Sequence, residues 1–232
     1  MAARARDRTE LAFLLGGLLL VVLLLGFAVV ADLVLVGETQ GFDDRVLRAL
    51  RRADDPALPI GPVWLRLAAL DITALGSGAV LGLVVFAIAG FMILQGLRRT
   101  ALFVCVASIG GLLLNSGLKE IFRRARPDVV PHLREVMTLS FPSGHAMTSA
   151  VVYLTLGALL MRVVPRRATK IYCMAVAILI AALVGLSRIY LGVHYPTDVL
   201  AGWLVGFSWA LFCWLIERAI ERRRGVEQAH GA

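Results

Sequence analysis

The stretch LAFLLGGLLLVVLLLGFAVVA, residues 11–31, decides the class of fold, because it contains no charged or strongly polar side chain. An apolar helix of roughly 20 residues is long enough to cross the hydrocarbon core of a bilayer. Further along the chain, similar apolar runs cover about 72–96, 101–118, 146–164, 171–187 and 198–216. The sequence therefore predicts an all-α, polytopic membrane protein whose six transmembrane helices form a bundle.

The composition supports this class. Of the 232 residues, 59% are hydrophobic and 17% are charged, against about 25% charged in ordinary soluble domains. These values exclude a disordered chain and a nucleic-acid-binding module, and they argue against a soluble enzyme. The net charge of +8 comes from basic residues between the apolar runs, where membrane topology and anionic head groups explain them. We therefore expect membrane lipids, and no nucleic acid, as partners.

The loops predict an orientation. With the N-terminus inside, slightly more Lys and Arg residues fall on the inner side, and the inner loops 97–100 and 162–170 carry only positive charge. Both termini are then inside. Loops 119–145 and 188–197 face the periplasm or exterior of a plasma (inner) membrane. Segment 41–52, GFDDRVLRALRR, reads as a short amphipathic helix on this outer surface.

The first polar cluster is KEIFRRARP, residues 119–127. Lys119 and Arg126 are seven residues apart, two turns of a helix, and Arg123 lies between them at i+4, so a continuous helix would align three cations. Pro127 would end that helix. Such a stripe suits an anion with several oxygens, such as phosphate. Taken alone, it is more simply explained as the positive flank of a membrane helix, the commonest use of such residues.

The second cluster is FPSGH, residues 141–145, directly before the fourth apolar run. Ser143 can cap that helix, and Gly144 lets a ligand approach the backbone closely. Free N–H groups at a helix N-terminus bind anions. A simple helix start would explain Ser143, but it needs no imidazole, so His145 suggests chemistry.

The third cluster is SRIYLGVHYPTD, residues 187–198, which joins the fifth and sixth runs. Pro196 suits the first turn of a helix, which places Asp198 near that helix's N-terminus and His194 just ahead of it. A carboxylate beside a histidine holds the ring and selects its tautomer. A lone interfacial histidine is usually only solvated, but here Arg188 and Asp198 accompany it.

Together the clusters match K-x6-RP, PSGH and SR-x5-H-x3-D. The sequence resembles the type 2 phosphatidic acid phosphatase superfamily, in its bacterial membrane-bound lipid phosphatase branch, over about residues 72–216. We predict a single membrane phosphatase domain spanning 1–232. Every fixed position of the three motifs is present: Lys119, Arg126, Pro127, Pro142, Ser143, Gly144, His145, Ser187, Arg188, His194 and Asp198.

The residues suggest a division of roles. His194 is the candidate nucleophile, Asp198 orients it, and His145 is the candidate general acid. The resemblance implies the same assignment, with a phosphohistidine intermediate that water hydrolyses. No metal or cofactor is expected, because side chains supply the positive charge. The predicted phosphate-binding residues are Lys119, Arg126, Ser143, Gly144 and Arg188, with Arg123 and Ser187 as additional candidates.

The predicted function is therefore a metal-independent lipid phosphatase. Undecaprenyl pyrophosphate is favoured as substrate, because the site is predicted to face outward and Arg123 would add a fourth cation for a second phosphate. Phosphatidylglycerophosphate and phosphatidic acid fit the same motifs. A transporter and a noncatalytic lipid-binding relative are alternatives of other classes. The sequence makes no prediction of oligomeric state.

Overall fold

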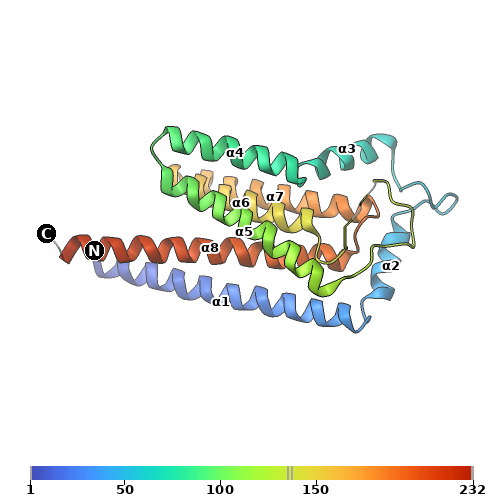
Figure 1. Cartoon of the computed structure of the whole chain (residues 1–232), viewed down its shortest axis with the longest axis horizontal. Helices are drawn as coiled ribbons and strands as arrows, with labels where there is room; N and C mark the ends of the chain where they lie inside the picture. Colours follow the sequence, from blue (N-terminus) through green and yellow to red (C-terminus); the bar gives the residue numbers. More distant parts are fainter. Residues whose placement is uncertain (1, 135, 137, 231–232) are drawn as a thin grey trace.

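The chain folds as an all-helical bundle (Figure 1), which confirms the predicted class. The computed structural model describes residues 2–134, 136 and 138–230, with the backbone alone for 2–9 and 223–230. These described residues form no β-strand. The helices are α1 (Ala2–Leu35), α2 (Gln40–Ala49), α3 (Val63–Ala74), α4 (Gly78–Leu94), α5 (Arg98–Phe122), α6 (Gly144–Val163), α7 (Arg167–Tyr190) and α8 (Pro196–His230).

The membrane spans match the prediction, with one correction. Five helices (α1, α5, α6, α7 and α8) are each long and apolar enough to cross a membrane, and α3 with α4, bent by 50° at a short break, makes a sixth if the pair is one span. The predicted run at 72–96 is therefore broken: it takes in the end of α3 and all of α4. Ser77 starts a new helix by accepting a hydrogen bond from the Val80 amide at 3.3 Å. The protein is a multi-pass membrane protein.

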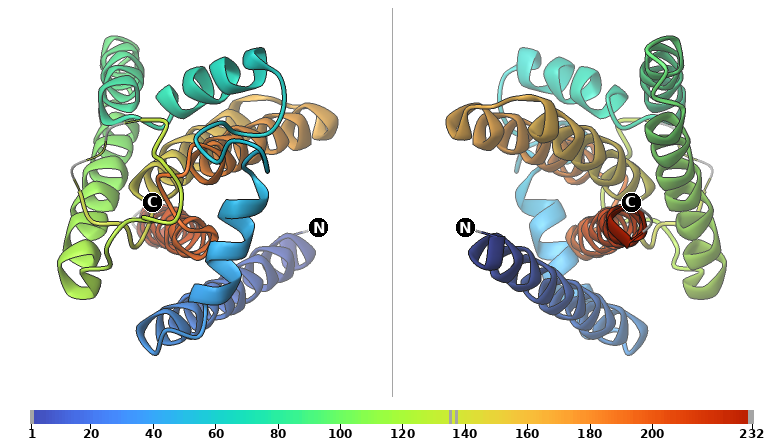
Figure 2. Two further views of the ribbon diagram at one scale, coloured as in Figure 1. Left: turned by 90° about the vertical axis from the view of Figure 1, so that its right-hand side faces the viewer. Right: turned by 90° about the vertical axis from the view of Figure 1, so that its left-hand side faces the viewer.

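Helix α6 forms the centre of the bundle and packs against α5, α7 and α8. In the most apolar 18-residue stretch of α6, 44% of the residues are buried, whereas in the corresponding stretch of α1 only 6% are. Helix α1 packs along α8 and stands at the edge of the bundle, as both end views show (Figure 2). Most of the α1 surface is therefore exposed to membrane lipid, which explains why its sequence is apolar on every side.

Two glycines draw α8 against α6. A Cβ on Gly202 would lie 2.7 Å from the Ser143 carbonyl oxygen, and one on Gly206 would lie 2.7 Å from the Met147 carbonyl oxygen. Small residues at such spacing let membrane helices approach closely. The close approach brings the start of α6 beside the start of α8, and both carry predicted site residues.

The three motif-bearing segments meet at one end of the bundle, together with α2 (Figure 1). This confirms that the loops after α5 and α7 share one side. Both ends of the described chain lie at the opposite end. Helix α2 confirms the predicted amphipathic helix, and it buries Asp43 and Leu47 on one face.

Candidate active site

A buried histidine–aspartate pair lies at the centre of the site. His194 precedes α8 and is 1% exposed, and Asp198 lies in the first turn of α8 and is fully buried. His194 Nδ1 is 3.4 Å from Asp198 Oδ2. Helix α8 begins at Pro196, as the sequence predicts, and the first turn then carries the carboxylate back toward the ring.

The contacts of His194 assign its tautomer. Arg126 Nη1 lies 3.1 Å from Nε2, and a guanidinium can only donate, so Nε2 is the unprotonated nitrogen. The ring proton is then on Nδ1, facing Asp198. Burial lowers the pKa of His194, and the neighbouring carboxylate opposes this only in part. The ring is therefore neutral at pH 7, with a lone pair at Nε2.

Asp198 is itself held from several directions. Its Oδ2 accepts from the Ser140 hydroxyl at 2.5 Å and from the Tyr195 amide at 2.9 Å, and its Oδ1 accepts from Arg124 Nη1 at 2.8 Å. Hydrogen bonds of this number hold a carboxylate ionised and fix its direction. The imidazole is consequently oriented by a rigid acceptor.

Arg124 links this carboxylate to α2. Its Nη2 donates to Asp43 Oδ2 at 2.8 Å, and its guanidinium lies 4.1 Å from the centre of the Tyr195 ring. Asp43 also accepts from the Thr197 amide and hydroxyl, at 3.1 and 2.6 Å. Burial works to lower the pKa of Arg124, but the Asp198 and Asp43 carboxylates outweigh it and raise that pKa. Arg124 is therefore a fully charged bridge between two buried acids.

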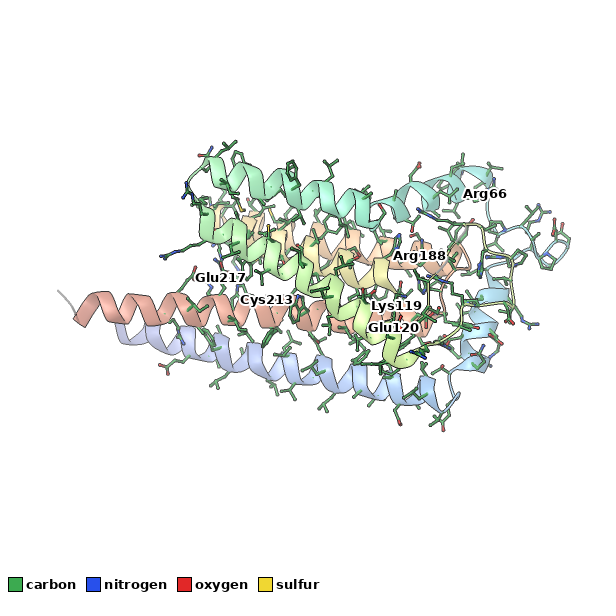
Figure 3. The ribbon with its side chains drawn as sticks, in the orientation of Figure 1. Arg66, Lys119, Glu120, Arg188, Cys213 and Glu217 are labelled. Carbon is green, nitrogen blue, oxygen red and sulfur yellow. The ribbon has the colours of Figure 1, made fainter. Side chains whose placement is uncertain are left out.

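Three further cations surround the pair without an acid of their own. Within the described part of the chain, no carboxylate lies at ion-pair distance from Lys119, Arg126 or Arg188. Lys119 donates to the Leu139 carbonyl. Figure 3 shows Lys119 and Arg188 in the same half of the molecule, on α5 and α7. Their charge is thus available to an anion.

Arg126 lies closest to the reactive nitrogen. Besides its contact with His194, it donates to the Thr138 carbonyl at 2.6 Å and to the Val193 carbonyl at 2.5 Å. These bonds connect the segment after α5 to the loop before α8. A bound phosphate would have to share or replace some of them.

Arg188 is 1% exposed, and its Nη1 donates to Thr73 Oγ1 at 2.9 Å. Its Nε has no hydrogen-bond partner among the described residues. A buried cation with a free donor is costly unless an anion completes its contacts. Thr73 belongs to α3, so the bent α3–α4 span contributes directly to the site.

The start of α6 adds free polar groups. Ser143 occupies the cap position, as predicted, but its hydroxyl makes no capping bond and is buried without a partner, as is His145 Nε2, among the described residues. The Ser143 amide donates to the Asp198 carbonyl at 2.9 Å. A Cβ on Gly144 would lie 3.0 Å from Asn115 Oδ1. The glycine thus lets α6 begin close against α5.

The two additional candidates, Arg123 and Ser187, lie apart from the cluster in this structure. Helix α5 ends at Phe122, and Arg123 adopts a left-handed conformation with φ of 44°, so no continuous helix aligns Lys119, Arg123 and Arg126. The Arg123 side chain is 75% exposed and contacts Glu120. Ser187 donates to the Val184 carbonyl of its own helix at 2.6 Å. Neither side chain joins the cluster around His194.

The sequence analysis missed Arg124, Asp43, Ser140 and Thr73. Arg124 stands in a run of arginines, where membrane flanking explains any one of them. Asp43 carried a usable signal: it lies four residues before Leu47, so it shares the apolar face of an amphipathic helix. A carboxylate on such a face requires a buried partner.

The chain is similar in sequence to known membrane phosphatases. The model of the PAP2 superfamily matches residues 100–222. Phosphatidylglycerophosphatase B of Bacillus subtilis is 34% identical over 187 residues, which cover 79% of this chain and 87% of that protein. An undecaprenyl-diphosphatase of Sulfolobus acidocaldarius is 32% identical over 126 residues, which cover 52% of this chain and 56% of that protein.

A solved structure has the same arrangement of helices. The crystal structure of a transmembrane PAP2 type phosphatidylglycerolphosphate phosphatase from Bacillus subtilis is similar with a TM-score of 0.78 and 32% sequence identity. The match covers 87% of this chain and 96% of that chain. The similarity therefore extends well beyond the three motifs.

Proposed function

Because this chain belongs to the PAP2 superfamily, we propose that it is a lipid phosphatase that hydrolyses a phosphomonoester or pyrophosphate group of a membrane lipid. One observation carries the proposal. Lys119, Arg126 and Arg188 converge on a buried, neutral histidine, and no carboxylate among the described residues neutralises them. Neighbouring Arg124, in contrast, is paired with two acids.

This contrast favours phosphate as the ligand. Buried cations that lack acids are stable only when an anion completes their contacts. A phosphoryl group offers several oxygens and takes charge-assisted bonds from Lys and Arg. The Arg188 Nε and the Ser143 hydroxyl, both buried without partners among the described residues, supply further donors.

In the first step, the Nε2 lone pair of His194 attacks phosphorus, and the bond to the lipid oxygen breaks. The bound phosphate dianion favours the protonated form of His145, which gives its proton to that oxygen, so that the lipid leaves as an alcohol or a lipid phosphate. His194 keeps its Nδ1 proton, and Asp198 stabilises the positive charge that develops on the ring. The product of this step is a phosphohistidine.

In the second step, water attacks the phosphohistidine. His145, now neutral, accepts a proton from that water, and the bond between phosphorus and Nε2 breaks. Inorganic phosphate leaves, and both histidines return to their starting protonation. Lys119, Arg126 and Arg188 stabilise the equatorial oxygens in both transition states.

Residues 1–232 act as one domain in this proposal. Asp43 lies outside the region matched by the family model, and Asp198 lies inside it. Both contact Arg124. The N-terminal part of the chain thus supports the orientation of the nucleophile.

Phosphatidylglycerophosphate is the substrate that we place first. Similarity to a protein named for that substrate extends over most of both chains, whereas similarity to the undecaprenyl-diphosphatase covers about half. The sequence-based preference for a pyrophosphate substrate also relied on Arg123 as a fourth cation. In the structure, the Arg123 side chain instead lies beside Glu120. Undecaprenyl pyrophosphate is the second candidate, because its diphosphate would still contact three cations.

The experiment measures phosphate release from both lipids by the purified protein in one detergent. We expect kcat/KM to be higher for phosphatidylglycerophosphate. A tenfold preference corresponds to about 1.4 kcal/mol of transition-state binding. A tenfold preference for undecaprenyl pyrophosphate would reverse the order of the two candidates. Release from neither of these lipids nor from phosphatidic acid would contradict the phosphatase proposal.

A second experiment, with the chelator EDTA, tests whether side chains or a metal ion balance the charge of the phosphate. Activity should persist in excess EDTA, because Lys119, Arg126 and Arg188 are proposed to balance the phosphate charge. The measurement is the initial rate with EDTA, with Mg²⁺ added back afterwards. Loss of the rate in EDTA and its recovery with Mg²⁺ would contradict metal independence.

A further inference from the structure

A cavity lies far from the His194–Asp198 pair. It is an apolar groove of about 820 Å³ between α1, α6, α7 and α8, within the range of about 300–1,000 Å³ typical of ligand pockets. It lies in the half of the molecule where Figure 3 labels Glu217, whereas Lys119 and Arg188 are in the other half. Each helix contributes to its walls, for example Leu23, Ala158, Ile178 and Leu211.

Helix α1 forms one wall of the groove, and its position depends on close contact with α8. A Cβ on Gly16 would lie 3.0 Å from the Leu215 side chain. Nearer the end of the bundle, the Arg222 guanidinium lies 4.6 Å from the centre of the Phe13 ring. Both contacts hold α1 on α8, so the wall facing α6 and α7 stays apolar and open.

Charged residues line the end of the groove. Arg162 is paired with two acids, although its Nε has no hydrogen-bond partner among the described residues: it contacts Glu217 and donates to Glu221 at 3.2 Å. Arg218 is 3.6 Å from Glu221 and lies over the Trp214 ring at 5.6 Å. Lys170 also lines the groove, and its side-chain ammonium forms no ion pair or hydrogen bond within the described part of the chain. One cation therefore remains available at the end of an apolar groove.

We propose that this groove binds one anionic glycerophospholipid, with an acyl chain along the apolar walls and its phosphate at Lys170. Apolar walls alone would not select a lipid, because they are no more apolar than the surrounding acyl chains. Selection has to come from the head group, and the unpaired ammonium favours a net negative one. This site is separate from the proposed active site and does not depend on the proposed function.

Trp214 lines the groove and serves as the reporter. The full-length protein in detergent micelles is titrated with phosphatidylglycerol or phosphatidylcholine, each brominated in its acyl chains. We expect saturable quenching by the phosphatidylglycerol at about fivefold lower mole fraction, from the interaction of one lysine with an anionic lipid. Trp214→Phe should remove the saturable component, because the remaining tryptophans lie outside the groove.

Two matched variants locate the effect. Lys170→Gln should abolish the difference between the two lipids. Arg99→Gln removes the same charge from an exposed position at the start of α5 that does not line the groove, and it should keep the difference. Both variants should release phosphate at the wild-type rate, since neither residue belongs to the proposed active site.

Three outcomes would overturn the proposal. Equal quenching by both lipids in the wild type would mean that the groove does not distinguish head groups. An unchanged preference in Lys170→Gln would remove its stated cause. Loss of quenching as the protein forms dimers would show that a second copy of this chain occupies the groove.

Discussion

His194 is buried, and its reactivity therefore depends on the groups that surround it. We expect His194→Ala to lower phosphate release by at least about a thousandfold, because no other group offers a lone pair at that position. His132→Ala is the matched control, since this exposed histidine lies in the loop after α5, and among the described residues its side chain makes a polar contact only with the Pro127 carbonyl. Acid-labile labelled phosphate should be trapped on the wild type and on His132→Ala. A wild-type rate in His194→Ala would contradict the mechanism.

The neighbours Arg123 and Arg124 provide a sharper test at the same scale. Arg124→Lys keeps a charge but loses the fork that bridges Asp198 and Asp43. The imidazole would lose its fixed orientation, and we expect kcat to fall by about ten- to a hundredfold, with KM nearly unchanged. Arg123→Lys should have no effect, because that side chain is exposed beside Glu120.

Thermal unfolding separates a loss of orientation in these two arginine variants from a simple loss of stability. Thermal unfolding of Arg124→Lys in detergent should remain cooperative, so that a fall in kcat can be assigned to orientation. Equal kinetics in Arg123→Lys and Arg124→Lys would show that the bridge does not position the nucleophile.

At this scale, motif spacing anticipated most of the cluster, and the exceptions have physical causes. His194 and Asp198 are four residues apart, so local geometry alone brings them together. Arg124 and Asp43 are separated by 81 residues, and no periodic pattern links such distant positions. Arg123 lies apart from the cluster because α5 ends at Phe122, whereas the spacing argument assumed a helix through residue 126.

Among the elements, the contact of α6 with α8 controls the geometry of the site. In Gly202→Ala, the new Cβ would meet the Ser143 carbonyl oxygen at 2.7 Å, and a backbone atom cannot rotate away. We expect a loss of about 1–3 kcal/mol in stability and a lower kcat, because Ser143 and Gly144 would shift. Thermal unfolding in detergent and phosphate release measure the two effects.

Gly82→Ala in α4 is the control for this element, because nothing lies within 4 Å of the position of its Cβ. Alanine in a helix interior is favoured over glycine by roughly 0.5–1 kcal/mol, so this variant should be neutral or slightly stabilised. Equal destabilisation of both variants would indicate that α6 and α8 do not depend on the close approach at Gly202.

The elements themselves were largely predictable, because hydrophobic length identifies a membrane helix directly. The bend between α3 and α4 was not, since the apolar run continues through Leu75 and Gly76. At the bend, a Cβ on Gly76 would lie 2.4 Å from the Val184 side chain, so α7 packs closely against the break. Length and composition carry no information about such a contact.

For the whole molecule, we expect the site to face the periplasm or exterior. The test places one cysteine at Asp128, an exposed residue of the loop after α5, in a background without Cys105, Cys173 and Cys213. An impermeant thiol reagent should label intact cells, because basic loops remain inside. Arg99→Cys, at the opposite end, should label only after lysis. The reverse pattern would place the site in the cytoplasm.

The contact between Asp43 and Thr197 joins residues that are 154 positions apart, which has a consequence for biosynthesis. At roughly 5–20 residues per second, the ribosome delivers Thr197 about 8–30 seconds after Asp43. During that interval the Asp43 carboxylate lacks the partners that it has in the folded protein. A place on the short helix α2, at the end of the bundle, lets water solvate it meanwhile, whereas a spanning helix would expose it to lipid. The last hairpin to enter the membrane would then close the site and displace that water.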